Sequence, residues 1–342
     1  MKNQIIIARS LPTSHQRGFT LIELMVSITI GLVILAALVG VLAANSGDSK
    51  TNDRTAELNT DGRFALNSLK QELRQAGYRG YTWAIPSLPG VMGLPTSPTI
   101  NTCFEAGSSY EAFVSNLRQG VWGADNVVSS SGANKNPFLD TCIPAGRFAT
   151  GNDILVVRRV SGAPTAVASL SASSVYFHSS YSVGQMFKGA TTPTFGTVTP
   201  LADFPVMVYV YYISPYTVSA TESPLVPSLR RRALGSDGLM ADELVVSGIE
   251  HMQVQYGRLN TNATTRYLDA IDIPGNSADS VDINTNYQWD EVNSVQIWLL
   301  ARNSVTEPGY SNTQTYAMGN VSLTKADGYR RQLFSTVVQL RN

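Results

Sequence analysis

The most informative chemical group in this sequence is the carboxylate of Glu23, which lies at the start of a long apolar run. Residues 24–44 contain no Asp, Glu, Lys or Arg over 21 positions. As a helix, this run would be about 32 Å long, enough to cross the roughly 30 Å hydrocarbon core of a membrane. A carboxylate at the mouth of such a helix is costly, so Glu23 is a candidate functional residue. The alternative is an ordinary signal anchor with an incidental acid.

The residues before the apolar run predict a processing site. An ordinary secretory signal is cut at small residues after a short apolar region. Here the candidate cut site, Gly18 between Arg17 and Phe19, precedes the apolar region. Cleavage at Gly18 would therefore leave the membrane helix on the mature protein.

The segment from Gly18 to Val26 resembles the type III leader of type IV pilins and of type II secretion pseudopilins. In that family a prepilin peptidase cuts after the glycine and methylates the new amine. The resemblance implies that Gly18 is the cleavage residue and Phe19 the N-methylated first residue. It also implies that Glu23 is the acid at the fifth mature position. The motif identifies the superfamily and not the member.

Within a bundle of such helices, the carboxylate of Glu23 could meet the cationic amine of Phe19 on a neighbouring subunit. Two opposite charges about 4 Å apart attract by about 4 kcal/mol at an effective dielectric constant of 20, before desolvation is subtracted. We therefore expect Glu23 to form an assembly salt bridge.

The rest of the sequence gives little support for catalysis. His15, His178 and His251 are the only histidines. The sequence has no nucleophile elbow, paired-histidine zinc motif or phosphate-binding glycine loop. His178 and His251 fall in expected strands, where a structural histidine is the usual case. We expect no enzyme activity, no catalytic residue, no metal site and no cofactor.

An acidic loop near residue 275 raises the question of calcium, which takes several oxygen ligands. The loop lacks the Asp-x-Asp-x-Asp-Gly spacing of a calcium-binding loop, so we expect a solvated polar loop. Its candidate ligands are Asp269, Asp272, Asn276, Asp279, Asp282, Asn284 and Asn286.

Charge and cysteine content place the body outside the cytoplasm. The basic residues of the first 18 positions precede the apolar run, so the positive-inside rule puts this leader in the cytoplasm. Both cysteines, Cys103 and Cys142, follow the run, and we predict one disulfide between them. Without residues 1–18 the chain has 22 basic and 25 acidic residues, which gives no nucleic-acid footprint. The short basic cluster Arg230–Arg232 is expected to be solvated or paired within the chain, with a partner contact as the alternative.

The elements that must position these groups are one long helix and a set of strands. Leu66, Leu69, Leu73 and Ala76 follow helical spacing, so we predict a helix from Ile22 to Ala76, stopped by Gly77. Residues 78–150 are rich in Gly, Pro, Ser and Asn and are expected to form an irregular lobe that holds the disulfide. Strand patterns follow at 153–158, 174–178, 206–213, 251–256, 292–302 and 334–340. The strand at 206–213 is apolar on both faces and is expected to be central, and the alternation at 251–256 predicts a half-buried strand. This order predicts an α+β, pilin-like fold in which the helix packs on an antiparallel sheet.

Later segments of the chain, each weak alone, together resemble the PilW family of minor pilins in their order. They are residues 73–78, 211–213, 248–250, 255–257, 329–331 and 340–342. The resulting expectation is a leader (1–18), a membrane or filament-core helix (19–44), an amphipathic helix (45–77), the irregular lobe (78–150) and a β-rich body (151–342).

The resemblance implies a minor pilin that primes type IV pilus assembly and ends in a complex at the pilus tip. It also implies an inner-membrane, single-pass precursor with a periplasmic body. The implied partners are other minor pilins, the major pilin, the prepilin peptidase, the inner-membrane assembly platform and a large tip adhesin. A minor pseudopilin of a type II secretion system and an adhesive tip-binding module are the alternatives. The pseudopilin family usually has a shorter body, and weak acidity disfavours DNA binding.

Overall fold

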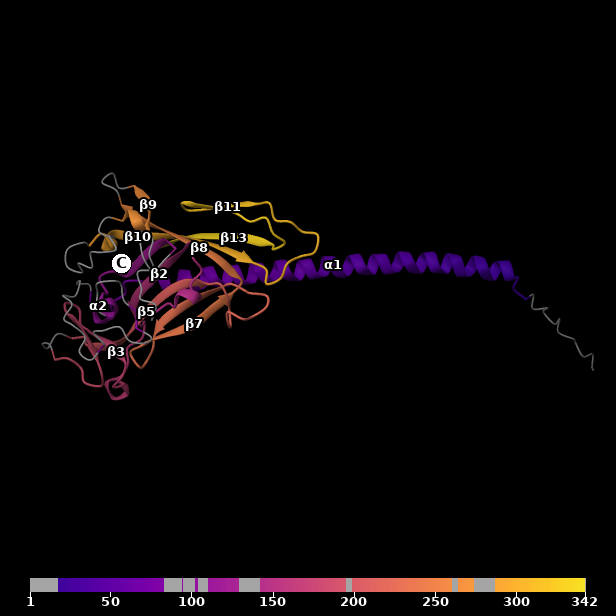
Figure 1. Ribbon diagram of the computed structural model, residues 1–342. Coiled ribbons are helices and arrows are strands. Elements are labelled where there is room, and N and C mark those ends of the chain that lie inside the picture. Colours follow the sequence, from indigo (N-terminus) through magenta and orange to yellow (C-terminus); the bar gives the residue numbers. More distant parts are fainter. Residues whose placement is uncertain are drawn as a thin grey trace, which may run out of the picture. The chain divides into compact units, whose positions relative to one another are not determined.

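A computed structural model of the chain describes residues 18–82, 94, 102–103, 110–128, 142–194, 199–259, 264–273 and 287–341. The chain divides into two compact units, residues 1–54 and 55–342, which we describe separately. One helix, α1 (Leu21–Leu73), extends across this division, and strands dominate the described part of the chain after it (Figure 1). The α+β expectation is therefore confirmed.

The strands form three antiparallel sheets. The largest has the order β1-β2-β5-β3-β4, with β6 paired to β5 and β7 paired to β6. Its strands are β1 (Val121–Val127), β2 (Asn152–Val160), β3 (Val175–Ser179), β4 (Gly184–Lys188), β5 (Ala202–Ser214), β6 (Ser228–Leu234) and β7 (Met240–Ser247).

A second sheet has four strands in the order β13-β10-β8-β9, and β11 and β12 form a separate hairpin. These strands are β8 (Ile249–Leu259), β9 (Thr265–Asp269), β10 (Val292–Arg302), β11 (Thr315–Met318), β12 (Val321–Thr324) and β13 (Arg331–Gln339). The short helices are α2 (Tyr110–Ser115), η1 (Ala145–Arg147), η2 (Val167–Ser169), η3 (Ala270–Asp272) and η4 (Tyr287–Glu291).

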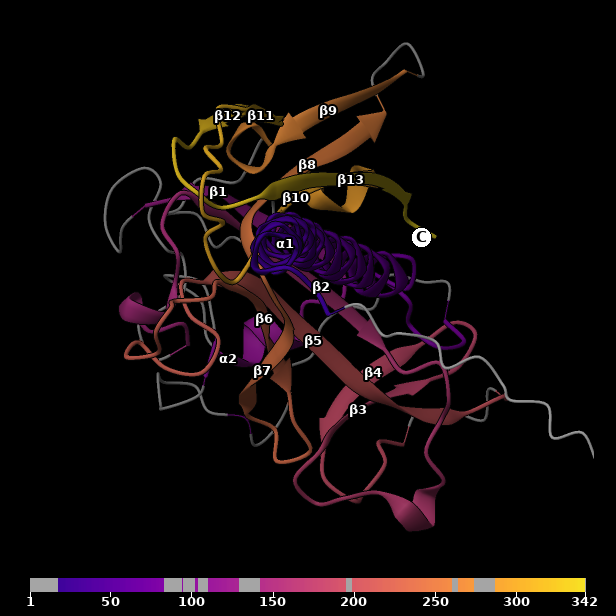
Figure 2. The ribbon, with the colours of Figure 1, turned by 90° about the vertical axis from the view of Figure 1, so that its right-hand side faces the viewer.

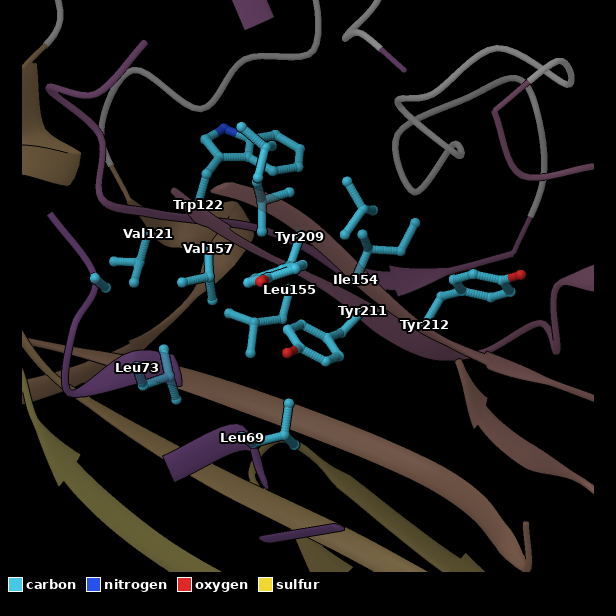
Figure 3. Close-up of a cluster of buried hydrophobic side chains, with 14 of the residues drawn as sticks. Leu69, Leu73, Val121, Trp122, Ile154, Leu155, Val157, Tyr209, Tyr211 and Tyr212 are labelled. Carbon is cyan, nitrogen blue, oxygen red and sulfur yellow. The ribbon is translucent and has the colours of Figure 1, made fainter. Parts of the chain in front are cut away.

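From Thr55 onward, α1 runs between the seven-stranded and four-stranded sheets (Figure 2). Leu69 and Leu73 are fully buried and face the tyrosines and aliphatic side chains of β5 and β2 (Figure 3). On the side of the four-stranded sheet, Phe334 of β13 lies so close to Gly62 that a Cβ there would be 2.1 Å from its ring. The helix therefore packs against two sheets, whereas the sequence led us to expect packing against one.

Polar contacts fix the end of this helix against β2. The carboxylate of Glu72 is 2.7 Å from the guanidinium of Arg159, and both side chains are largely buried. The helix ends at Leu73, three residues before the expected end, because tighter turns replace the helical hydrogen bonds. Gly77 then takes a left-handed conformation (φ 78°) and donates its amide to the carbonyl of Arg158. The prediction that Gly77 stops the helix is confirmed.

Two adjacent side chains at the start of β2 join the two larger sheets. Asn152 Oδ1 accepts a hydrogen bond from the amide of Met252 (2.8 Å), and Asp153 Oδ2 accepts one from Val254 (2.7 Å). Both amides belong to β8, where β9 provides no pairing partner. Burial raises the pKa of Asp153 well above its usual range, against the opposing effect of its backbone hydrogen bonds. These two side chains therefore accept hydrogen bonds from buried amides of β8 that would otherwise be unpaired.

Two of the strand expectations were wrong in detail. The range 78–150, expected to be irregular, contributes β1, which pairs with β2 in the main sheet. Strand β8, expected to be half-buried, is buried on both faces over most of its length. On its polar face, Gln253 donates to Asn126 Oδ1 (3.1 Å) and to the carbonyl of Gly151 (3.3 Å). The end of β1 and the turn before β2 therefore cover this face.

The other strand expectations were confirmed. Strand β5 is buried on both faces over Tyr209–Ser214, as a central strand requires. In β10, Val295, Ile297 and Leu299 share a buried face. In β13 and the residue after it, the positions from Phe334 to Leu340 alternate between partly or fully buried and exposed.

One carboxylate organises the loop between β5 and β6. Glu222 accepts hydrogen bonds from the amides of Thr217 (2.8 Å), Val218 (2.7 Å), Ser219 (3.4 Å) and Val226 (3.0 Å). Desolvation alone would raise the pKa of Glu222, but these four hydrogen bonds together lower it to about 2. The loop is therefore held in one conformation by an ionised side chain.

Removing the centre of the helix stripe should destabilise the body. Replacing Leu69, which is fully buried, by Ala should lower the free energy of unfolding by about 2–5 kcal/mol, because it leaves a cavity between α1 and the sheet. The control is Asn67→Ala on the exposed face of α1, which should change it by less than about 0.5 kcal/mol. Urea unfolding followed by the fluorescence of buried Trp122 and Trp289 measures both.

The Glu222 loop predicts a specific pH dependence. The folded-state pKa of about 2 lies below the unfolded value of 4.5, so the stabilisation is complete above about pH 4.5 and is lost as the pH falls through 2. Glu222→Gln should therefore destabilise the protein at pH 7, and its difference from wild type should shrink between pH 4.5 and 2. Thermal melting across this range measures the difference. A constant gap at all pH values would contradict the role of the charge.

Candidate functional site

The residues of the processing motif lie at the start of α1. Phe19 is 87% exposed, and a Cβ on Gly18 would meet nothing within 4 Å. Packing within the described part of the chain therefore does not require glycine at position 18.

Glu23 forms a capping box with Thr20 at the helix start. Its carboxylate accepts hydrogen bonds from the backbone amide (2.9 Å) and the hydroxyl (2.8 Å) of Thr20. In return, the amide of Glu23 donates to the hydroxyl of Thr20 (3.3 Å). The sequence signal for this arrangement is a Thr three residues before a Glu, followed by an apolar run, and our sequence reasoning missed it. Within the single chain, Glu23 thus already has a hydrogen-bonding partner.

The apolar side chains that follow are unpacked within their own unit. The large apolar residues from Leu21 to Leu42 are 50–76% exposed. By length and composition, α1 contains a segment that can cross a membrane. Such a surface is costly in water, so it must be covered by lipid or by other apolar helices.

The two cysteines form the expected disulfide. Cys103 and Cys142 are bonded, with Cα atoms 4.7 Å apart, and both are fully buried. The carbonyl of Cys142 accepts a hydrogen bond from Nε of Arg232 in β6. The disulfide is therefore attached to the main sheet.

The basic cluster at 230–232 is paired within the chain. Arg230 is 2.8 Å from Asp242, and Arg231 is 2.7 Å from Glu243, both across the β6–β7 pair. With Arg232 bound to Cys142, this confirms the intrachain interpretation and leaves no basic patch at these three positions.

The histidines have structural surroundings. His178 Nδ1 is 2.6 Å from a carboxylate oxygen of Asp203, and both side chains are buried. His251 is also buried, and desolvation lowers its pKa to about 4, so it is neutral at pH 7. In the part of the chain that the structure describes, no group of three or more His, Cys, Asp or Glu residues is arranged to hold a metal ion.

Of the acidic loop, only its first part can be placed. The carboxylate of Asp269 accepts a hydrogen bond from Nε2 of Gln255 (2.8 Å), and Asp272 lies in η3. The remaining candidate ligands lie outside the described residues; they are Asn276, Asp279, Asp282, Asn284 and Asn286.

The fold brings together segments that are distant in the sequence. Arg331, whose side chain is 1% exposed, donates from Nε and Nη2 to the carboxylate of Glu250, and it also binds Asp327. Gly248 is left-handed (φ 80°), and its carbonyl accepts the amide of Arg302. Two of the short segments noted in the sequence, 248–250 and 329–331, thus form one ion-pair cluster at the end of the four-stranded sheet.

Comparisons with known proteins agree with these features. Residues 210–342 match the family described as type IV pilus-assembly protein W (PilW). Residues 13–39 match the prokaryotic N-terminal methylation motif. A search of curated proteins and a search of solved structures each found no match. The two family matches cover the processing motif, the start of α1, the ion-pair cluster and every strand from β6 to β13.

The disulfide gives a direct chemical prediction. Denatured, unreduced protein should show no thiol that reacts with a maleimide, and reduction should expose two. Replacing both Cys103 and Cys142 by Ser should lower the free energy of unfolding by about 4 kcal/mol, from the loop of about 40 residues that the bond closes. Limited proteolysis should then cut first within 78–150. Two reactive thiols before reduction would contradict the bond.

Proposed function

We propose that this chain is a type IV pilin of the PilW family and acts as a minor pilin that helps to prime pilus assembly within a complex at the pilus tip. The observation that carries the proposal is the joint presence of the methylation motif, an apolar helix segment whose large side chains are exposed, and a match to the PilW family over residues 210–342. Pilin-like proteins of this kind interact with other pilus components, and their function is structural rather than catalytic.

The proposed processing begins at Gly18. A prepilin peptidase would cut between Gly18 and Phe19, remove residues 1–18 and methylate the amine of Phe19. The open surroundings of Gly18 support this, because no packing among the described residues requires a glycine there. The precursor would be held in the inner membrane by residues 19–44, with its body in the periplasm, and the mature protein would then pass to the pilus.

The proposed assembly contact is the salt bridge between Glu23 and the amine of Phe19 on a neighbouring subunit. Phe19 is highly exposed, so the amine that cleavage after Gly18 would create there could meet another helix. The apolar side chains of Leu21–Leu42 would be buried at the same time against other pilin helices. Assembly would thus remove an exposed apolar surface and pair two charges in one step.

The size of the body supports a place at the filament end. Residues 55–342 form one compact unit, and a unit of this size is awkward to repeat along a tightly packed shaft. At the end of a filament it would meet no such restriction. The proposed partners are other minor pilins, the major pilin, the assembly platform and a tip adhesin.

A gene deletion with complementation tests this proposal. The deletion should sharply reduce surface pili while the major pilin is still made and processed. Wild-type protein should restore the pili, and Glu23→Ala and Glu23→Gln should not, because the neighbouring amine then loses its charged partner. Electron microscopy of the cells and immunoblots of sheared pili measure the outcome.

Thr20→Ala is the matched control, because it removes the cap, worth about 1 kcal/mol, and keeps the carboxylate. It should restore pili. If Thr20→Ala does not restore pili, the role of Glu23 is to cap the helix rather than to form the salt bridge. Immunogold labelling should give rare signal at filament ends. Dense labelling along the shaft, or normal piliation in the deletion strain, would contradict a priming role at the tip.

A further inference from the structure

A cleft of about 460 Å³ opens in the body, at the side of the Glu250–Arg331 ion pair. Its walls come from the residues before β2, the β5–β6 loop, the start of β8, the end of β10 and the β12 side of the hairpin. This volume lies in the usual range of small-ligand sites. None of its lining residues lies in the processing motif or the disulfide, and the proposed function makes no use of it.

Part of the lining is apolar. Phe148, Leu225, Leu323 and two prolines face the cleft, and Leu225 is 45% exposed. An apolar lining with a few convergent polar groups is typical of a binding site for a small group. It would accept a short hydrocarbon chain.

The charged part of the lining is cationic. Arg302 donates from Nη2 to the carbonyl of Leu225 (2.6 Å) and lies 4.1 Å from the ring centroid of Tyr329. Its Nη1 is 3.8 Å from Glu250, which is too far for a hydrogen bond. Its Nε is buried, with no hydrogen-bond partner within the described residues. The guanidinium of Arg302 is thus held in place and only partly satisfied.

The carboxylate nearest to this cation, Glu250, is shared with a second cation, Arg331. Both oxygens of Glu250 accept hydrogen bonds from Arg331. Lys325, also in the lining, is exposed and forms no ion pair in the described parts of the chain. Among the residues that line the cleft, two cations, Arg302 and Lys325, thus face one carboxylate, Glu250, which also pairs with Arg331.

A buried polar side chain completes the lining. His251 is 7% exposed and faces the cleft beside Glu250. Its Nε2 is 3.4 Å from Nε2 of Gln253. A neutral imidazole can donate or accept a hydrogen bond without adding charge, which suits the polar end of an anion held chiefly by Arg302 and Lys325.

One wall of the cleft is held in place before any ligand enters. The β5–β6 loop is fixed by the four amide hydrogen bonds to Glu222, and its Leu225 carbonyl holds Arg302. Preorganised walls reduce the entropic cost of binding. We propose that this cleft binds a carboxylate carried next to a short branched apolar group, with Arg302 and Lys325 on the carboxylate and Leu225 and Leu323 on the apolar group. The source is either a small organic acid or an acidic residue within an apolar peptide.

Binding of matched probes to the full-length protein in detergent micelles tests this proposal. The small-acid probes are 4-methylpentanoate and its amide. The peptide probes are an acetylated, amidated leucine–aspartate–leucine tripeptide and its asparagine counterpart. Saturation-transfer NMR titrations give the dissociation constants. Each acid should bind more tightly than its neutral counterpart, and the tighter of the two acids identifies the source.

Variants of the lining locate the binding. Arg302→Gln should weaken binding of the acid roughly tenfold or more, since it removes a hydrogen bond to a charged group. Lys325→Gln, on the surface and safe for folding, should weaken it about two- to fivefold, and more at low salt than at high salt. The matched control is Lys70→Gln, which removes a surface cation from α1 outside the cleft and should leave binding unchanged.

Three results would overturn the proposal. They are neutral probes that bind as tightly as the acids, acid binding that is the same in Lys325→Gln as in wild type, and no binding of any probe at about 20 mM, where millimolar affinities would be detected. None of these results bears on pilus assembly, so the binding proposal can be disproved while the proposed function stands.

Discussion

The structure depends on one constraint: a single helix must suit two different surroundings along its length. Up to Ala44 the side chains of α1 are apolar on every face, and the large ones are exposed within their own unit. After Thr55 the apolar residues narrow to a stripe, and this stripe is buried between two sheets. A helix that is apolar on every face must be covered by lipid or by other helices. A helix with a single apolar stripe can bury that stripe against the globular part of its own chain. The change of pattern therefore divides the assembly surface from the folding core.

The position of the helix between two sheets explains much of the body. A helix covered on one side by a single sheet would leave its opposite face free. Here Leu69 and Leu73 pack on the seven-stranded sheet, and Gly62 meets Phe334 of the four-stranded sheet. The two sheets are also joined directly, because the side chains of Asn152 and Asp153 at the start of β2 accept hydrogen bonds from amides of β8. A substitution at either place would act on both sheets.

The sequence predicted the elements that have a strong local pattern. Helical spacing in α1 and alternation in β10 and β13 appear directly in the residue order, because one face of each is buried. Strand β1 was missed because its polar residues Asp125 and Asn126 form contacts with distant segments, and such contacts leave no periodic pattern. The second buried face of β8 was missed for the same reason, since Gln253 looks like a solvent-facing residue until Asn126 and Gly151 cover it. Hydrogen bonds to distant segments thus allow the polar side chain of Gln253 to be buried.

The candidate sites divide in the same way. The processing motif is local, so nine consecutive residues, Gly18–Val26, carry it, and the Thr20–Glu23 cap could have been predicted from the same residues. The ion pair of Glu250 with Arg331 joins positions 81 residues apart, and the cleft beside it draws on five segments. No spacing rule connects residues at that separation. Only the fold reveals that Arg302 is held by Leu225 and left with an unsatisfied Nε.

The cap on Glu23 has a physical consequence for the proposed assembly. An unpaired carboxylate is costly in a membrane, yet a pilin must wait there before it is assembled. In the single chain, Thr20 supplies two hydrogen bonds to Glu23, so the carboxylate is never without a donor. A neighbour's amine would replace neutral donors by a cation, and this adds a Coulomb attraction to the carboxylate that Thr20 cannot supply. The exchange needs no intermediate with a bare carboxylate in lipid. Thr20 therefore lowers the free-energy cost of holding the Glu23 carboxylate in the membrane before assembly. The charged pair then favours the assembled state over the free one.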